Sequence, residues 1–245
     1  MEKMLDRIES YWSTRVEGYS EVNQKELEGM QKQAWLQVLE KEFPPVSKEE
    51  IKILDVGTGP GFFPRILAEA GYSVTAVDYT PEMLEKAGEN AGEFRHRIQF
   101  YRMDAQNLEF EDAVFDVVIS RNLTWTLPDA AQAYREWFRV LKKGGILLNF
   151  DANYGLSDFA DTTGLPETHA HHTVGDEMMR ECEEIKRQLP ISSYSRPAWD
   201  LETLGKMKIE KFDIDLGISS RIYLEKDEFY NPTPMFRICA EKPHA

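Results

Sequence analysis

The stretch Ile51–Gly61, which reads IKILDVGTGPG, decides the fold of this 245-residue chain. An apolar run leads into a turn that has glycines at positions 57, 59 and 61. A short apolar run closed by turn residues predicts a buried parallel strand. Glycines directly after a strand let the backbone bend sharply and approach a ligand closely. The segment that follows, FFPRILAEAGY, has the apolar spacing of a helix, and Gly71 is suited to end it.

A second apolar run, YSVTAVDY, follows this helix and contains Asp78 at its end. The two runs and the helix predict a βαβ unit, with a glycine turn after its first strand and a carboxylate after its second. This arrangement binds a ribose-bearing cofactor, because the helix N-terminus faces the ligand and the acid accepts hydrogen bonds from ribose hydroxyls.

The spacing of the glycines indicates which cofactor is bound. A dinucleotide turn reads G-x-G-x-x-G, and here Phe62 occupies the position of its third glycine. Phe62 therefore disfavours a nicotinamide dehydrogenase, and Asp55 suits a ligand with a positive end better than a diphosphate. The segment resembles motif I of the class I S-adenosylmethionine-dependent methyltransferases, D/E-x-G-x-G-x-G. A glycine-lined corner without a ligand is the alternative.

The rest of the chain predicts more strands and helices in alternation. Apolar runs RIQFYRMDA, ending at Asp104, AVFDVVISRN, ending at Asn122, and GILLNFDAN predict three further strands. Thr80 and Pro81 are suited to begin one helix. Another helix is predicted from about Asp129, with Leu141 on its buried face. Lys142 and Lys143 lie in its predicted last turn, and Gly144–Gly145 are predicted to end it.

Strands that alternate with helices in this way predict an α/β fold with a doubly wound, mostly parallel sheet. KIEKFDIDLG and PMFRICAEKP supply the last two strands. The family resemblance covers roughly Ile51 to Asn153 and implies a Rossmann-like sheet of seven strands whose last strand is antiparallel.

Four regions are predicted along the chain. Residues 1–45 form an N-terminal helical lid, in which two helices flank the segment YWSTRVEGYSEVN, and residues 46–151 form the cofactor-binding core. Residues 152–204 form a substrate cap inserted after the fifth strand, where it lies over the carboxyl ends of the strands. Residues 205–245 complete the sheet.

The resemblance also implies roles for individual residues. Asp55, Gly57 and Gly59 would contact the methionine part of the cofactor, Asp78 the ribose, and Asp104 the adenine amino group. Tyr79 and Met83 would lie beside the adenine, or would pack as core residues of their helix. The full set implied at the cofactor is Tyr19, Asp55, Gly57, Thr58, Gly59, Gly61, Asp78, Tyr79, Met83, Asp104, Ala105 and Asn122.

Trp125, Tyr154, His169 and His171 are predicted to bind the methyl acceptor. The candidates for a catalytic group are His171, Tyr11 and Tyr154. The sequence THAHH is read as a solvated loop, as a source of a general base, or as metal ligands, and no metal site is predicted because no spaced carboxylate or cysteine completes a ligand set.

The segment YWSTRVEGYSEVN resembles the N-terminal segment that covers the cofactor in many small-molecule methyltransferases. The resemblance makes Tyr11, Arg15 and Tyr19 candidates to contact cofactor or substrate.

Composition restricts the choice of partner. The net charge of −14 argues against a nucleic-acid substrate, which normally needs a basic face. Two cysteines without a CxxC spacing indicate a reduced, cytoplasmic setting, and no apolar run is long enough to cross a membrane. The predicted activity is methyl transfer from S-adenosylmethionine to a small molecule. A protein or RNA methyltransferase and a non-catalytic S-adenosylmethionine-binding module are the alternatives, and the oligomeric state is left open.

Overall fold

The computed structural model describes residues 2–169, 172 and 174–244. Its helices and strands, in chain order, are α1 (Glu2–Glu28), α2 (Gln31–Glu42), β1 (Ile53–Val56), α3 (Phe62–Glu69), β2 (Val74–Asp78), α4 (Pro81–Asn90), β3 (Ile98–Arg102), β4 (Phe115–Arg121), α5 (Ala130–Val140), β5 (Leu141–Ala152), α6 (Asp176–Gln188), α7 (Ala198–Gly205), β6 (Lys211–Asp215), α8 (Ile218–Ile222) and β7 (Met235–Glu241).

The strands form one seven-stranded sheet in the order β3-β2-β1-β4-β5-β7-β6. Strands β1 to β5 pair in parallel, whereas β7 runs antiparallel to both β5 and β6. This confirms the predicted doubly wound sheet with an antiparallel last strand.

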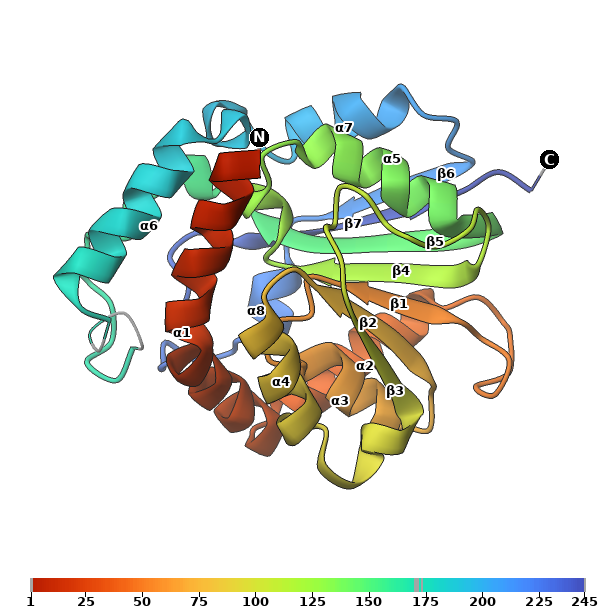
Figure 1. Cartoon of the computed structure of the whole chain (residues 1–245), viewed down its shortest axis with the longest axis horizontal. Helices are drawn as coiled ribbons and strands as arrows, with labels where there is room; N and C mark the ends of the chain where they lie inside the picture. The colour runs from red at the N-terminus through yellow and green to blue at the C-terminus, as the bar shows by residue number, and fades with distance from the viewer. Residues whose placement is uncertain (1, 170–171, 173, 245) are drawn as a thin grey trace.

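Helices cover both faces of the sheet, and alternate strand residues point to each layer. Helices α5 and α7 lie on one face, and α2, α3, α4 and α8 lie on the other (Figure 1). In β1, Leu54 packs into the core beneath α5, while Ile53 packs with Trp35 of α2. Because both faces are covered, the strands are apolar on both sides, as parallel strands require.

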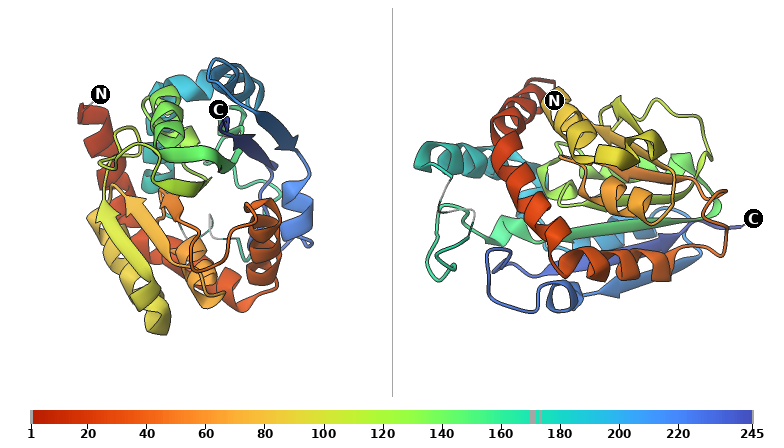
Figure 2. Two further views of the ribbon diagram at one scale, coloured as in Figure 1. Left: turned by 90° about the vertical axis from the view of Figure 1, so that its right-hand side faces the viewer. Right: turned by 90° about the horizontal axis from the view of Figure 1, so that it is seen from below.

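Helix α1 stands at the carboxyl-terminal edge of the parallel strands, between the sheet and α6 (Figure 1 and the right-hand view of Figure 2). It contacts α4 and α6, and the chain then turns back into α2 under the sheet. No helix of the described part of the chain combines the length and the apolar character needed to cross a membrane.

The predicted division of the N-terminal region is wrong in one respect, because YWSTRVEGYSEVN is helical and α1 runs unbroken to Glu28. Its buried face continues through Ser20, Asn23 and Glu26, which are polar and therefore give no apolar pattern. The break falls at Gly29 and Met30, and the Met30 side chain is 71% exposed rather than part of a buried helix face.

The predicted end of the helix from Asp129 is also wrong. Helix α5 ends at Val140, and Leu141 already pairs with Phe115 of β4. The Lys142 ammonium lies 2.7 Å from the Asp116 carboxylate, so Lys142 contacts the neighbouring strand β4. The glycines at 144 and 145 lie inside β5, beside a shift of register in its pairing with β4. Glycine within a strand is typical of such an irregularity.

Candidate functional site

The glycine turn after β1 folds back against β2. The backbone N–H groups of Gly57 and Thr58 both donate to the carbonyl oxygen of Val77, at 2.9 and 3.0 Å. Gly57 and Gly61 have φ angles of +69° and +88°, a left-handed conformation that favours glycine. At Gly61, a Cβ atom would lie 2.9 Å from the Cβ of Ala87, so this glycine lets the turn pack tightly against α4.

Asp78 ties the end of β2 to this turn. One carboxylate oxygen accepts the N–H of Gly59 at 2.8 Å, and the other accepts the N–H of Thr80 at 2.9 Å. Burial raises the pKa of Asp78 above its ordinary value, and these backbone hydrogen bonds oppose the shift. Each oxygen has a second lone pair, so the carboxylate can accept hydrogen bonds from a ligand as well.

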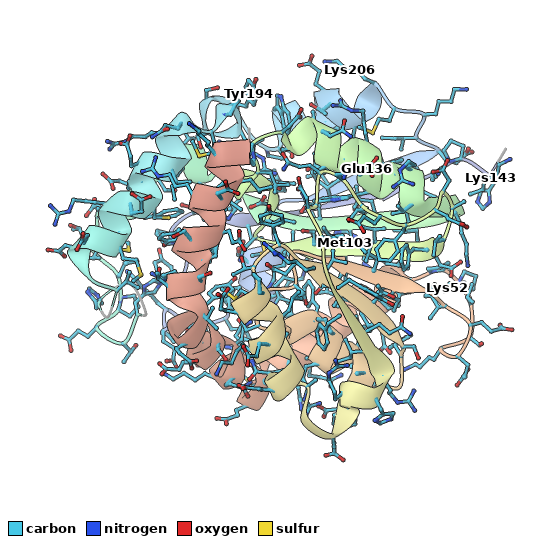
Figure 3. All side chains as sticks on the ribbon, in the orientation of Figure 1. Lys52, Met103, Glu136, Lys143, Tyr194 and Lys206 are labelled. Carbon is cyan, nitrogen blue, oxygen red and sulfur yellow. The ribbon has the colours of Figure 1, made fainter. Side chains whose placement is uncertain are left out.

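A pocket, which we call the glycine-turn pocket, opens along the carboxyl ends of β1, β2, β3 and β4. Met103, labelled in Figure 3, lines it, whereas the labelled Lys52 and Lys143 mark the opposite end of the sheet. Of the residues implied at the cofactor, those that line this pocket are Tyr19, Gly57, Gly59, Asp78, Tyr79, Met83, Asp104, Ala105 and Asn122.

Three of the implied cofactor residues do not line the glycine-turn pocket in the described part of the chain: Asp55, Thr58 and Gly61. Asp55 is only 2% exposed, and burial raises its pKa to about 7. Thr58 and Gly61 belong to the turn and contribute to its backbone conformation. The motif marks where the chain bends, and only part of the motif faces the cavity.

A second cavity of about 230 Å³, which we call the aromatic pocket, lies between α1, the segment after β5 and the loop before β7. The rings of Trp125, Tyr154 and Phe159 form a cluster in its wall, with centroids 5.3 to 5.4 Å apart. Trp12 of α1 approaches the same cluster, with its centroid 6.3 Å from that of Trp125. Such a concave, largely apolar cavity is typical of a small-molecule site.

The two pockets share Trp12, Tyr19, Arg121 and Asn122 in their walls. Asn122 follows β4 with a positive φ of 55°, which aims its side chain at this junction. Its amide oxygen accepts a hydrogen bond from the Tyr154 hydroxyl at 3.1 Å, and Trp125 donates to its backbone carbonyl at 2.9 Å. Asn122 therefore links the turn side of the site to the aromatic side.

A buried ion pair fastens α1 at the same junction. The Arg121 guanidinium lies 3.0 Å from the Glu26 carboxylate, and the hydroxyl of Tyr223, the residue directly after α8, donates to that carboxylate at 2.7 Å. The guanidinium also lies over the ring of Phe62, 4.3 Å from its centroid. Its charge is thus balanced within the protein, and the pair joins α1, β4 and α8.

A second buried network holds Trp125 in place. Trp125 lies in the short turn η2 (Thr124–Thr126). Its backbone N–H donates to the Asp151 carboxylate, at the end of β5, at 3.0 Å. Arg196 donates to Asp151 at 2.9 Å and to Asp200 of α7 at 2.8 Å. All three charged side chains are at most 2% exposed. The network joins the sheet, the wall of the aromatic pocket and α7.

Trp125, Tyr154 and His169 line the aromatic pocket, as does Tyr11, whereas His171 lies outside the described residues. Burial raises the pKa of both Tyr11 and Tyr154, so both phenols are protonated near neutral pH and are poor general bases. Burial lowers the pKa of His169, which favours its neutral form. His172 is exposed.

The sequence did not identify the contribution of the segment between β6 and β7. The aromatic pocket is lined by residues 228–233 and by Tyr223, directly after α8. The Asn231 amide donates to the Tyr154 hydroxyl at 2.9 Å. The Asn-Pro pair at 231–232 indicates a loop, but nothing local shows that this loop reaches the site. Arg121 and Glu26 were likewise not identified.

Comparison with known proteins indicates what kind of domain the chain contains. Residues 54–149 match the family model described as a methyltransferase domain. This match, together with the sheet order, supports a class I S-adenosylmethionine-dependent methyltransferase domain over these residues.

Among its relatives, the glycine/sarcosine N-methyltransferase of Aphanothece halophytica is 30% identical over 65% of this chain and 61% of its own length. The 2-methyl-6-phytyl-1,4-hydroquinone methyltransferase of a Synechocystis species is 39% identical over 41% of this chain and 32% of its own length. The chain thus spans less than two thirds of the length of each of these relatives.

Solved structures share the fold. A Methanococcus maripaludis protein assigned as an S-adenosyl-L-methionine-dependent methyltransferase superimposes with a TM-score of 0.63 at 22% identity, covering 94% of this chain and 93% of that one. The phosphoethanolamine N-methyltransferase 2 of Haemonchus contortus, in complex with phosphomonomethylethanolamine and S-adenosylhomocysteine, gives a TM-score of 0.58 at 18% identity, covering 85% of this chain and 52% of that one.

Proposed function

We propose that this chain transfers a methyl group from S-adenosylmethionine to a small molecule held in the aromatic pocket. The observation that carries the proposal is the junction of the two pockets at Tyr19, Arg121 and Asn122. A donor in one pocket and an acceptor in the other would meet at this junction. A module that only binds the cofactor has no need of a second pocket that shares a wall with the first.

The residues of the glycine-turn pocket fit the cofactor. Asp78 presents a carboxylate for the ribose hydroxyls, and Asp104, which lines the same pocket, presents one for the adenine amino group. Gly57 and Gly59 allow the methionine part to approach the backbone, and the ring of Tyr19 lies 3.4 Å from the position that a Cβ atom on Gly59 would take. The cofactor supplies an activated methyl group on its sulfonium.

The protein's own contribution is alignment and the exclusion of water. Helix α1 closes the junction with Trp12 and Tyr19. Tyr154 holds the amide oxygen of Asn122, and Trp125 holds its backbone carbonyl oxygen. Because Tyr11 and Tyr154 remain protonated, they would orient the acceptor by hydrogen bonding rather than remove its proton.

A small acceptor is favoured over a macromolecular one by the position of the aromatic pocket. Helix α1, the segment after β5 and the loop before β7 surround it, so a polymer would need these segments to move apart. The net charge of −14 also opposes binding to nucleic acid, which relies on contacts from basic residues to phosphates.

The proposal is tested by titration calorimetry of the purified chain with S-adenosylmethionine, S-adenosylhomocysteine and NAD. We expect both sulfur ligands to bind and NAD not to bind. A screen of small metabolites for release of S-adenosylhomocysteine would then identify the acceptor. If neither sulfur ligand bound, the proposed function would be wrong.

A further inference from the structure

The two arginines that line the aromatic pocket differ in their partners. Arg121 is paired with Glu26 at 3.0 Å. Arg15, on the same face of α1 as Trp12 and Tyr19, has no carboxylate within 4.0 Å in the described part of the chain. Its one side-chain hydrogen bond there is a weak one to the Met178 sulfur of α6, at 3.8 Å.

Arg15 differs from the other arginines of the described part of the chain in its partners. The chain has 43 acidic residues against 29 basic ones, and the other arginines that lack a carboxylate partner, Arg95, Arg97 and Arg180, each donate to a backbone carbonyl oxygen instead. On the same helix as Arg15, Arg7 lies 2.6 Å from Glu181. A half-buried guanidinium among aromatic side chains loses hydration that only an anionic partner restores well. Arg15 is therefore placed where a ligand would supply that partner.

The acidic side chains around the aromatic pocket do not neutralise Arg15. Glu26 is paired with Arg121, and Glu228 lies 2.5 Å from Lys25. Asp158 and Asp161 are exposed at the rim, and each accepts a backbone N–H within its own loop. The charge that remains inside the aromatic pocket is thus positive.

We propose that the acceptor pocket selects a planar, unsaturated small molecule that carries a carboxylate, and that Arg15 binds this carboxylate. This inference rests on the proposed function of the same site. The rings of Trp12, Trp125 and Phe159 supply apolar surface for a flat body. Arg15 supplies two parallel N–H donors, which match the geometry of a carboxylate. Arg15 lines the aromatic pocket but not the glycine-turn pocket, so its place indicates the acceptor rather than the cofactor.

The test uses three probes that share one ring and differ in charge: indole-3-acetate, indole-3-acetamide and tryptamine. Each is titrated into the full chain saturated with S-adenosylhomocysteine. The variants are Arg15→Gln and, as a matched control on the same helix, Arg7→Gln. We expect indole-3-acetate to bind most tightly to the wild type, and Arg15→Gln to weaken it by about tenfold or more while leaving the acetamide unchanged. Arg7→Gln should leave the affinity for indole-3-acetate unchanged.

Several outcomes would overturn the inference. Tighter binding of tryptamine would show that the pocket prefers cations, and an unchanged affinity of Arg15→Gln for indole-3-acetate would remove the role of Arg15. Weaker binding of S-adenosylhomocysteine itself to Arg15→Gln would reassign the guanidinium to the cofactor. If S-adenosylhomocysteine bound but no probe did, this inference would fail and the proposed function would stand. If S-adenosylhomocysteine did not bind the wild type, the proposed function would fail first.

Discussion

The two pockets of this protein are built in different ways. Residues that end or directly follow the parallel strands contribute to the glycine-turn pocket, such as Gly57, Asp78 and Asn122. The aromatic pocket is assembled from segments far apart in the chain: α1, the stretch after β5, and the loop before β7. The first pocket depends on local turn geometry, and the second depends on how separate elements pack.

This difference predicts that the two pockets can change independently of each other. Parallel strands bring their carboxyl ends to one edge of the sheet, so the glycine-turn pocket follows from the fold itself. The walls of the aromatic pocket are held by side-chain networks, above all Arg196 with Asp151 and Asp200. Changes in loops and caps can therefore alter the second pocket without disturbing the first.

The largest effect is expected where the aromatic pocket is fastened to the sheet. Arg196→Met leaves Asp151 and Asp200 buried without their cation, and this should lower the free energy of unfolding by about 3–5 kcal/mol. Urea unfolding would measure the change.

The matched control is Lys206→Met. Lys206 pairs with Glu202 at 2.9 Å, also four residues away in the sequence, but both side chains are 71% exposed. Its loss should change stability by no more than about 0.5 kcal/mol. Equal effects of the two variants would show that the buried network does not hold the pocket wall.

Asp78→Ala tests the other side of the comparison. The variant removes the acceptor of the Gly59 and Thr80 N–H groups together with the proposed acceptor of the ribose hydroxyls, so S-adenosylhomocysteine should bind about 100-fold more weakly. Calorimetric titration would measure this. Asp116→Ala is the control, because Asp116 also accepts a backbone N–H, from Lys52 at 2.8 Å, but at the opposite end of the sheet. A loss of less than threefold in Asp78→Ala would contradict the ribose assignment.

The same contrast governs what the sequence could predict. The order of strands and helices and most of the glycine-turn pocket were predictable, because each rests on a few adjacent residues. The continuity of α1 was not, since its buried face includes the polar residues Asn23 and Glu26, whose partners lie elsewhere in the chain. The approach of Asn231 to Tyr154 was equally hidden, because it joins residues 77 positions apart.

Asp55 provides an intermediate test, since the motif predicted it at the cofactor and the structure buries it. Its pKa of about 7 lies above the unfolded value near 3.9, so between these values the folded state binds one more proton. Stability from this group is complete below about pH 4 and is lost as the pH rises through 7. Between pH 5 and 6, the free energy of unfolding of the wild type should fall by about 1.4 kcal/mol more than that of Asp55→Asn. Parallel slopes for the two proteins would show that Asp55 is ionised in the fold.

The smallest expected effect concerns the wall that both pockets share. Gly18 lies within α1, and a Cβ atom added there would meet no atom within 4 Å. Because glycine is a poor helix former, Gly18→Ala should raise the free energy of unfolding by about 0.5–1 kcal/mol, measured by urea unfolding. Gly61→Ala should instead lower it, because Gly61 has a φ of +88° and Ala87 lies 2.9 Å from the added Cβ. If Gly18→Ala were destabilising, the chain would not be helical at this point, and the single helix that closes both pockets would have to be two.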